Sequence, residues 1–269
     1  MKLVIKVGGS LMKGDLPKGL IEDVASLAAK NSVVLVHGGG DVVTEVATRM
    51  GKEQKFVVSP GGMRSRYTDK ETAEIYQMVM TGVLGKKLVQ ALARAGSRAV
   101  SISGTDATLL QGKRKSRVIA VDDRGRKVAM DGGYTGKVQA VDPTLVDLLL
   151  GSGLVPVVSP VASSEEAEPL NIDGDRAAAS LAAGIGADAV VFLTNVDGLT
   201  LEGGLAERLT PEEAETSLPQ VGFGMQKKVL AAIEAVRAGV GEAIICSGTK
   251  PNPVSAALAH ETCTVVTSG

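Results

Sequence analysis

The sequence is poor in aromatic, cysteine and histidine residues: its 269 residues include 3 Phe, 3 Tyr, 2 Cys, 2 His and no Trp. Proteins that bind single-stranded nucleic acid usually stack bases on aromatic side chains, so we expect no nucleic-acid partner. Two cysteines and two histidines make neither a disulfide framework nor a histidine-rich metal centre, so we expect no metal held by the protein alone. No apolar run approaches the ~20 residues of a membrane span, and the N-terminus does not read as a secretory signal. We therefore expect a cytoplasmic protein without a membrane partner.

Charge is divided unevenly along the chain, although the formal net charge is −1. Residues 1–137 contain 23 Lys and Arg against 13 Asp and Glu, whereas residues 138–269 contain 6 against 17. This asymmetry suggests two halves with different partners. The basic half should attract an anionic substrate or an acidic protein over long range, unless it is only an unbalanced solvated surface.

Short apolar runs alternate with segments of helical periodicity, which predicts a mainly parallel sheet covered by helices on both faces. The expected fold class is therefore α/β, a three-layer αβα sandwich. Thr68, followed three residues later by Glu71, is expected to cap a helix that continues to about residue 95. The expected strands are 3–7, 33–36, 98–103, 154–159, 189–194, 243–246 and 263–267, and the other expected helices are 16–30, 41–50, 143–150, a segment after 175 that ends near 185, and 224–238.

Residues 109–140 have a different pattern, in which SRVIAV and RKVAM flank the turn sequence DDRG. This pattern predicts a β-hairpin. It is strongly basic, so it is either a solubilising face or a docking surface; its cations are Lys113, Arg114, Lys115, Arg117, Arg124, Arg126 and Lys127. We place the boundary between the two halves of the molecule near residue 170, giving an N-terminal half 1–170 and a C-terminal half 171–269.

Candidate chemistry lies where strands meet helices, which is where open α/β sheets bind ligands. Lys6 ends a buried strand just before Gly8 and Gly9, and glycines there let backbone N–H groups approach a phosphate. Gly38-Gly39-Gly40 precedes a helix, whose N-terminus favours anions. Lys228 is expected on the first turn of a helix, where a cation opposes the helix dipole. Two anion cradles with cations between them suit phosphoryl transfer.

These residues lie in motifs through which the chain resembles the amino-acid kinase family. The motifs are VIKVGGS (4–10), LVHGGG (35–40), RYTDKET (66–72), PLNIDGDRAA (169–178), TNVDG (194–198) and GMQKK (224–228). The resemblance covers essentially the whole chain and is strongest to the acetylglutamate-kinase branch. Residues 59–68, SPGGMRSRYT, depart from that branch and are similar to the kinases that act on amino acids linked to the acidic amino-group carrier protein LysW.

The resemblance implies a carbamate-kinase-like fold and a set of residue roles. Lys6 and Lys228 would stabilise the transferred phosphoryl group, with Asp175 holding both lysines in place. Arg66 would bind a substrate carboxylate. The other implied contacts are Gly39, Gly40 and Asn171 to the acyl substrate, and Gly8, Gly9, Thr194, Asn195, Asp197 and Gly198 to phosphate or nucleotide. ATP would be the phosphoryl donor, with Mg²⁺ on its phosphates rather than in a protein cage.

Several of these residues have alternative explanations. Asp175 could cap the following helix, Arg66 could pair with Asp69 or Glu71, and Lys227 rather than Lys228 could be the inward lysine. His37 is expected to be a packed histidine at the end of a strand. Arg64 and Tyr67 either change the charge of the acyl pocket or only shape its loop.

The resemblance implies an ATP-dependent kinase that phosphorylates the side-chain carboxylate of LysW-linked 2-aminoadipate, glutamate or both, in lysine or arginine biosynthesis. Its N-terminal half would bind the acyl substrate and form a homodimer, and its C-terminal half would bind ATP. The alternatives are an N-acetylglutamate kinase of arginine biosynthesis and a non-catalytic nucleotide-sensing protein on the same fold.

Overall fold

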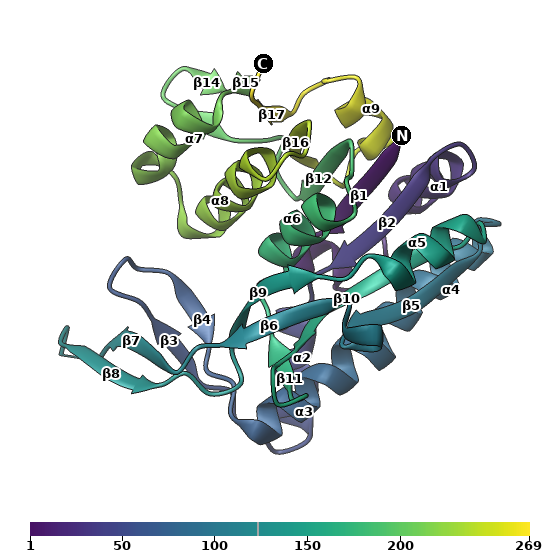
Figure 1. Ribbon diagram of the computed structural model, residues 1–269. Helices are drawn as coiled ribbons and strands as arrows, with labels where there is room; N and C mark the ends of the chain where they lie inside the picture. The colour runs from purple at the N-terminus through teal and green to yellow at the C-terminus, as the bar shows by residue number, and fades with distance from the viewer. Residues whose placement is uncertain (123) are drawn as a thin grey trace.

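A mainly parallel sheet of eleven strands runs through the whole molecule in the computed structural model, which describes residues 1–122 and 124–269 (Figure 1). The strand order is β15-β17-β16-β12-β1-β2-β10-β6-β9, and β5 and β11 also pair with β10. The strands are β1 (Lys2–Val7), β2 (Ser32–His37), β5 (Ala99–Gly104), β6 (Leu110–Arg114), β9 (Gly136–Val141), β10 (Val155–Ser163), β11 (Pro169–Asn171), β12 (Ala189–Thr194), β15 (Arg208–Leu209), β16 (Glu242–Ser247) and β17 (Thr264–Thr267).

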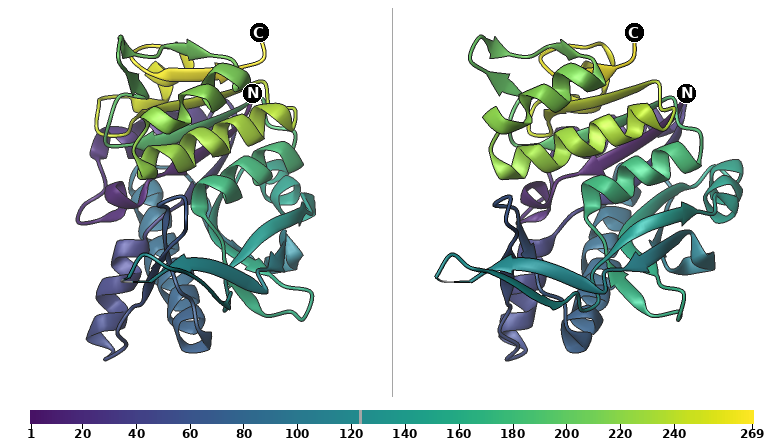
Figure 2. Two further views of the ribbon diagram at one scale, coloured as in Figure 1. Left: turned by 90° about the vertical axis from the view of Figure 1, so that its left-hand side faces the viewer. Right: turned by 60° about the vertical axis from the view of Figure 1, so that its left-hand side comes forward.

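Helices cover both faces of this sheet, which confirms the predicted three-layer αβα architecture (Figures 1 and 2). One face carries α5 (Thr144–Gly151), α6 (Gly174–Gly184), α7 (Pro211–Ser217) and α8 (Phe223–Arg237), and the other carries α1 (Lys18–Ala28), α2 (Gly40–Arg49), α3 (Lys70–Gln77), α4 (Gly85–Arg94) and α9 (Pro253–Leu258). Side chains of β1 alternate between the two cores: Val4 belongs to the first, and Leu3 and Ile5 to the second.

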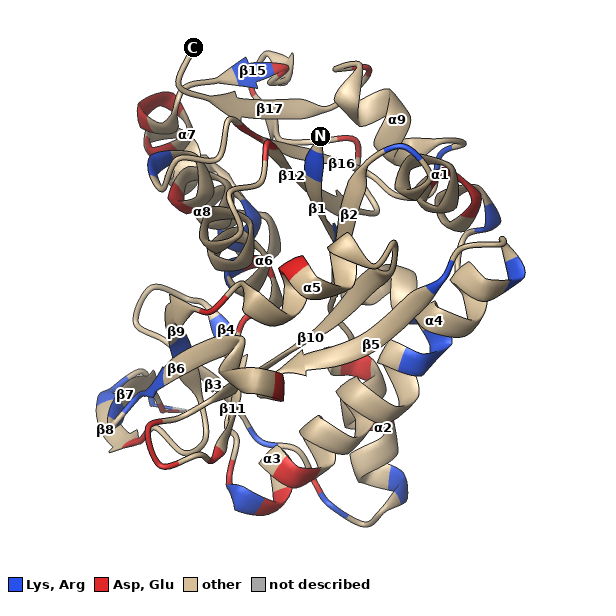
Figure 3. Ribbon diagram, turned by 45° about the vertical axis from the view of Figure 1, so that its right-hand side comes forward, with Lys and Arg blue, Asp and Glu red and all other residues tan. Residues whose placement is uncertain are grey.

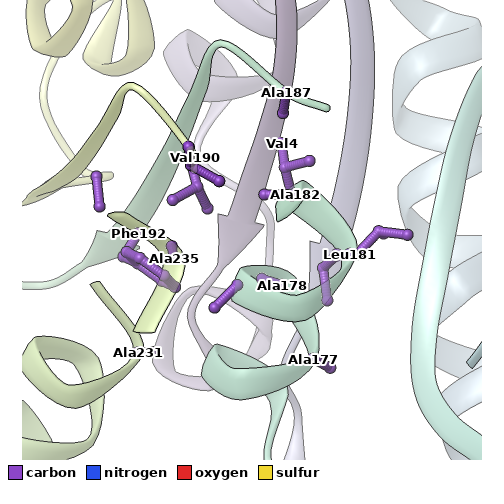
Figure 4. Packing of buried hydrophobic residues seen from close by; sticks show 14 of the residues in the cluster. Val4, Ala177, Ala178, Leu181, Ala182, Ala187, Val190, Phe192, Ala231 and Ala235 are labelled. Atoms are coloured by element: carbon purple, nitrogen blue, oxygen red, sulfur yellow. The ribbon is translucent and has the colours of Figure 1, made fainter. Parts of the chain in front are cut away.

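Small side chains allow α6 and α8 to pack closely against the sheet (Figure 4). Ala178 and Ala182 of α6 and Ala231 and Ala235 of α8 are fully buried in the same core as Phe192 of β12. Strand β1 pairs with β2 on one side and with β12 on the other. The two predicted halves therefore share one sheet, and β1 carries its residues into the space between them.

Two hairpins extend beyond the sheet and lie against each other (Figures 1 and 2). Strands β7 (Arg117–Val121) and β8 (Lys127–Asp131) form the predicted basic hairpin, and its base continues into the antiparallel pair β6–β9. Of the predicted turn Asp122–Gly125, Asp123 lies outside the described residues. Strands β3 (Phe56–Val58) and β4 (Arg64–Arg66) form a second hairpin that the sequence reading did not predict.

The helix expected from Thr68 to about residue 95 differs from the prediction at its start and in its middle. The side chain of Asp69, not Thr68, caps α3 by accepting a hydrogen bond from Thr72 N at 2.8 Å. Thr68 is buried and instead accepts a hydrogen bond from Asn171 Nδ2 at 3.0 Å. Between α3 and α4 the chain forms a π-helical segment, Met78–Leu84.

A short hairpin, β13 (Thr200–Leu201) with β14 (Gly204–Leu205), and the 3₁₀ turns Gly9–Met12, Asp106–Thr108 and Leu218–Gln220 complete the described elements. Within the described residues, no helix is both long and apolar enough to cross a membrane.

A buried carboxylate ties the first helix of the chain to the last. Asp23 of α1 is only 4% exposed, and its Oδ2 accepts hydrogen bonds from Val254 N at 2.7 Å and Ser255 N at 2.9 Å at the start of α9. The cap residue of α9, Asn252, makes no side-chain capping bond of its own. Asp23 therefore supplies from another helix the anion that the N-terminus of α9 favours.

We expect Asp23→Asn to lower the free energy of unfolding by about 1–3 kcal/mol, because the neutral amide removes the negative charge that faces the N–H groups of α9 and places a donor where Ser255 Oγ now donates. Urea denaturation measures this change. Glu22→Gln is the matched control on the same helix, since Glu22 is exposed and its ion-pair partner among the described residues is Lys18 at 3.5 Å. It should change stability by less than about 0.5 kcal/mol. Equal effects of the two substitutions would contradict the cross-helix cap.

Candidate active site

Three buried charged side chains from three elements meet in the space between the two halves of the molecule. Asp175 Oδ1 of α6 lies 2.7 Å from Lys6 Nζ of β1, and Asp175 Oδ2 accepts a hydrogen bond from Lys228 Nζ of α8 at 3.1 Å. The exposed fractions of the side chains of Lys6, Asp175 and Lys228 are 6%, 6% and 13%. We call these three residues the ion cluster.

The local fold explains how these residues converge. Lys6 is the second-last residue of β1, so its side chain reaches the carboxyl end of the sheet. Asp173 caps α6 by accepting from Asp175 N at 3.0 Å and Arg176 N at 3.2 Å, which leaves the side chain of Asp175 free to face the lysines. The alternative that Asp175 caps this helix is therefore wrong.

Lys228 is the inward lysine of the two candidates. Lys227 Nζ instead donates a hydrogen bond to Arg64 O at 3.2 Å and lies 3.6 Å from Asp173. The expectation that Lys228 lies on the first turn of its helix is wrong, because α8 begins at Phe223 and Lys228 falls on the second turn. The helix dipole acts mainly within the first turn, so the free energy lost by placing a lysine here comes mainly from burying its charge.

The charges of the ion cluster hold one another in place. Burial alone would raise the pKa of Asp175, but the ammonium charges of Lys6 and Lys228 keep that pKa below its ordinary value. Burial and the charge of Lys6 lower the pKa of Lys228, and the charge of Asp175 offsets part of this by raising it. Two cations share one carboxylate, and Asp175 Oδ1 accepts no well-aligned hydrogen bond from the described residues. The ion cluster therefore has positive charge to offer to a further anion.

Two glycine corners pack against each other beside the ion cluster. A Cβ on Gly8 would lie 2.6 Å from Leu193 O, and a Cβ on Gly38 would lie 2.9 Å from Gly9 N. Gly39 has a φ of 149° and precedes the first residue of α2, Gly40. A side chain at Gly38 would therefore force the two corners apart, and one at Gly8 would collide with β12. Backbone N–H groups at a helix start of this kind favour an anion.

A cavity of about 640 Å³ brings most of the predicted site residues together; those that line it are Lys6, Gly9, Gly39, Gly40, Arg66, Asn171 and Asp175. Lys228 is not among the described residues that line the cavity, but it donates a hydrogen bond to Asp175, which does line it. Gly8 is also not among the described lining residues; its N–H donates a hydrogen bond to Leu193 O at 3.1 Å.

The predicted nucleotide residues after β12 lie away from this large cavity. Gly198 lines a separate pocket of about 220 Å³ together with residues 220–222 and Met225, at the start of α8. Asp197 pairs with Lys250 at 2.6 Å, and Thr194 Oγ1 donates to Asn195 Oδ1 at 3.3 Å. Of these four residues, Gly198 therefore lines the small pocket, whereas Thr194 and Asp197 contact residues 248 and 250 of the C-terminal half.

Arg66 is a buried guanidinium without a carboxylate partner among the described residues. Its Nη2 donates hydrogen bonds to Gly40 O at 2.6 Å and Thr44 Oγ1 at 2.9 Å, and its Nη1 donates to Gln54 Oε1. Burial lowers its pKa. The alternative pairing with Asp69 or Glu71 is wrong, because Lys52 takes both of those carboxylates, at 2.9 Å and 2.6 Å. Arg66 is thus available to an anionic ligand in the cavity.

His37 is the packed strand-end histidine that the sequence predicted. It is fully buried, its Nε2 lies 3.0 Å from Ser159 Oγ, and its Nδ1 lies 3.1 Å from Gly38 O. Burial lowers its pKa to about 4, so it is neutral at pH 7. Its contact with Gly38 supports one of the glycine corners.

Arg64 and Tyr67 differ in their positions. Arg64 lines the cavity, and its guanidinium lies 3.7 Å from the ring centroid of Phe56 on the opposite strand of the hairpin. Arg64 therefore adds charge to the cavity, whereas Tyr67 is not among its described lining residues and makes a backbone bond to Lys55 O.

Several residues that line this cavity are not identified by sequence reasoning, among them Phe56, Lys115, Lys137 and Arg176. The sequence shows Lys115 only as one charge of a basic hairpin, because no local pattern specifies which of its lysines lies at the cavity. No group of three or more His, Cys, Asp or Glu side chains within the described part of the chain could hold a metal ion.

Comparisons with known proteins identify the family of this chain. Residues 1–247 match the family model described as "Amino acid kinase family". The chain is 45% identical over 257 residues to the LysW-aminoadipate/LysW-glutamate kinase of Saccharolobus islandicus strain L.S.2.15, covering 95% of this chain and 96% of that protein. It is 52% identical over 267 residues to a Cenarchaeum symbiosum protein provisionally given the same name, covering 99% and 100%.

Solved structures show the same fold. N-acetylglutamate synthase from Neisseria gonorrhoeae, with coenzyme A and N-acetylglutamate, superposes with a TM-score of 0.80 at 23% identity. That comparison covers 100% of this chain but 59% of the synthase chain. Carbamate kinase from Giardia lamblia, bound to AMP-PNP, superposes with a TM-score of 0.68 at 17% identity, covering 99% and 98%.

We expect Asp175→Asn to lower the free energy of unfolding by about 3–5 kcal/mol at pH 7, because it leaves two buried ammonium groups without a counter-charge. The loss should shrink as pH rises toward 10. A lysine whose native pKa is lowered releases its proton before the unfolded chain does, so the unfolded state binds more protons and stability rises with pH. Urea denaturation of variant and wild type between pH 7 and 10 measures both effects. A loss that is constant or grows with pH would contradict the arrangement.

Proposed function

Because the chain belongs to the amino acid kinase family, we propose that it transfers the γ-phosphoryl group of ATP to the side-chain carboxylate of 2-aminoadipate or glutamate linked to the carrier protein LysW. The product is an acyl phosphate of lysine or arginine biosynthesis. The ion cluster at the meeting point of two glycine corners is the observation that carries the proposal. Relatives at 45% and 52% identity over nearly the whole chain supply the substrate class.

This reaction requires the protein mainly to position the reactants and to supply positive charge. An oxygen of the acceptor carboxylate forms a bond to the γ-phosphorus while the bond from that phosphorus to the β–γ bridging oxygen breaks, and ADP leaves. A carboxylate is ionised at neutral pH, so the step needs no general base. Lys6 and Lys228 would flank the transferred group and stabilise the charge on its oxygens. Asp175 would hold the two ammonium groups at the right separation without touching the acceptor.

The acceptor would lie in the 640 Å³ cavity. Arg66, buried and without a carboxylate partner, suits the α-carboxylate of the amino acid, because its planar guanidinium can make paired hydrogen bonds. Gly39 and Gly40 would leave room for the acceptor beside the backbone, and Asn171 lines the same cavity, held by its bond to Thr68.

ATP would enter from the C-terminal side. Gly8 and Gly9 fit a phosphate, because their corner has no room for a side chain and lies beside the ion cluster. The 220 Å³ pocket near Gly198, between the segment after β12 and the start of α8, suits the base, with Thr194, Asn195 and Asp197 along the nucleotide. When bound with ATP, Mg²⁺ would neutralise charge on the phosphates.

The carrier would dock on the basic side of the molecule, where blue segments mark β6, β7 and β9 (Figure 3). We further propose a homodimer through the N-terminal half. Met78 and Val83, in the π-helical segment, are 52% and 50% exposed. Residues five apart in a π-helix lie one turn above each other, so this pair forms a small apolar face suited to a second copy.

We expect Lys228→Met to lower kcat by about 10²–10³, the usual effect of removing one donor to a transition-state charge. The KM for the acceptor should change much less. Arg237→Met is the control on the same helix, since the partners of Arg237 among the described residues are Glu212 and Glu215 at the protein surface. A coupled ADP-release assay measures both variants. If Lys228→Met keeps wild-type turnover, Lys228 does not stabilise the transferred phosphoryl group.

The acceptor is tested by offering carrier-linked aminoadipate, carrier-linked glutamate and free N-acetylglutamate to the same assay. We expect the carrier adducts to be used with much higher kcat/KM, and this value to fall as salt rises from about 50 to 500 mM, because salt screens attraction between exposed charges. Efficient use of free N-acetylglutamate with no response to salt would instead indicate an N-acetylglutamate kinase.

A further inference from the structure

One tyrosine of the apolar core has its hydroxyl group at the wall of the large cavity. Tyr76 lies on α3, is 6% exposed, and belongs to the same core as Val79 and Met80 of the π-helical segment that follows. Tyr76 also lines the cavity, and so does Pro160, whose carbonyl oxygen lies 3.4 Å from Tyr76 Oη. A phenylalanine would fill the same space in the core, so packing alone does not account for the hydroxyl.

The hydroxyl of Tyr76 has a poor hydrogen-bond partner in the free protein. It donates to Pro160 O at 3.4 Å, well beyond the distance of about 2.7–2.8 Å that is usual between a hydroxyl and an oxygen acceptor. The same carbonyl oxygen accepts a hydrogen bond from Ile172 N at 3.3 Å. A buried donor with so distant a partner is unfavourable, and a better acceptor bound in the cavity would remove that penalty.

Burial keeps this hydroxyl protonated. Burial and the negative charge of Asp173 raise the pKa of Tyr76 above its ordinary value, while the charge of Arg66 lowers it by less. Tyr76 is therefore neutral at pH 7 and remains a hydrogen-bond donor. Asp173 and Arg66 both line the cavity, so the hydroxyl lies among the charged groups of the site.

The part of the cavity wall that holds this hydroxyl adjoins the ion cluster. Pro160 Cγ and Lys6 Cε lie 3.8 and 3.6 Å from the position that a Cβ on Gly174 would occupy. In the proposed reaction, the side-chain carboxylate of the acceptor comes to the ion cluster while its α-carboxylate lies at Arg66. One oxygen of that side-chain carboxylate attacks the phosphorus, so the other is free to accept a hydrogen bond from the protein.

We infer that the Tyr76 hydroxyl donates a hydrogen bond to the side-chain carboxylate of the acceptor, at the oxygen that does not attack. This inference rests on the proposed function and adds a residue that positions its acceptor. A neutral donor suits this place, because it orients the carboxylate while leaving more negative charge on the attacking oxygen than another ammonium group would. The hydroxyl keeps its proton throughout the transfer.

The substitution Tyr76→Phe removes the hydroxyl and keeps the ring. Its effect is read with two carrier adducts, one of glutamate and one of norvaline, whose side chain has as many carbons but ends in a methyl group. We expect wild type to bind the glutamate adduct more tightly in calorimetry. Tyr76→Phe should reduce this preference by about tenfold or more, the size expected for a hydrogen bond to a charged group, without changing the affinity for the norvaline adduct. In the coupled assay, kcat/KM for the glutamate adduct should fall by a similar factor while the KM for ATP changes little.

Tyr134→Phe is the matched control. The hydroxyl of Tyr134 donates to Glu168 Oε1 at the same distance of 3.4 Å, but Tyr134 is not among the described cavity-lining residues. It should keep the wild-type preference. A preference that Tyr76→Phe leaves unchanged overturns the inference, and so does an equal loss of affinity for both adducts, which a disturbed fold would produce. A rise in the KM for ATP with the preference preserved also overturns it, since the hydroxyl would then act on the nucleotide.

The inference and the proposed function can fail separately. If neither carrier adduct is bound and none is phosphorylated, the proposed function fails. N-acetyl-L-glutamate and N-acetyl-L-norvaline then replace the adducts in the same comparison, because the inferred bond is to the side-chain carboxylate and not to the carrier. A preference for N-acetylglutamate that Tyr76→Phe removes supports the inference, and a preference that survives the substitution overturns it.

Discussion

One carboxylate between two ammonium groups is the interaction on which the rest of this structure depends. Asp175 is buried, and burial disfavours its charge, yet Lys6 and Lys228 at 2.7 and 3.1 Å keep it ionised. Two cations with one anion leave a local excess of positive charge at buried positions. On the proposed function, this excess would be costly in the free protein and favourable when a phosphoryl group passes between the lysines, so it would stabilise a transition state more than the ground state.

The sheet makes this arrangement possible. Because β1 lies between β2 and β12, its carboxyl end delivers Lys6 and the corner at Gly8 and Gly9 to the boundary of the two halves. Alanines on the facing sides of α6 and α8 let these helices approach each other, so that Asp175 and Lys228 can meet. The large cavity is lined by Lys6 and Asp175, whereas the smaller pocket near Gly198 is lined by residues after β12 and at the start of α8.

Much of this could be predicted from the sequence, because the signals are local. Runs such as residues 3–7 and 189–194 are continuous, apolar and short, which is typical of buried parallel strands, and the predicted αβα fold is confirmed. The family motifs located Lys6, Asp175 and Arg66, which the structure brings to one cavity. The packed role of His37 was also confirmed, since a strand-end histidine before three glycines has little room to act otherwise.

Predictions from the sequence are wrong where contacts between residues far apart in the chain determine the local structure. Thr68 fits a capping box, but Asn171 and the backbone of Tyr134 hold it, so Asp69 becomes the cap. The π-helical segment interrupts an even helical pattern at Met80, whose carbonyl accepts a hydrogen bond from Ser159 of a neighbouring strand at 3.1 Å. The inward position of Lys115 follows from the pairing of β6 with β9, which no local pattern specifies.

The central claim is that Lys6 and Lys228 recognise the migrating phosphoryl group more strongly than the bound nucleotide. The most direct measurement compares the affinity of wild type and Lys228→Met for ADP alone and for ADP with aluminium fluoride, a planar mimic of that group, in the presence of the acceptor. The account predicts that the substitution weakens binding of the mimic by about 10²-fold while ADP binding changes little. An equal loss for both ligands, or no loss for the mimic, would contradict it.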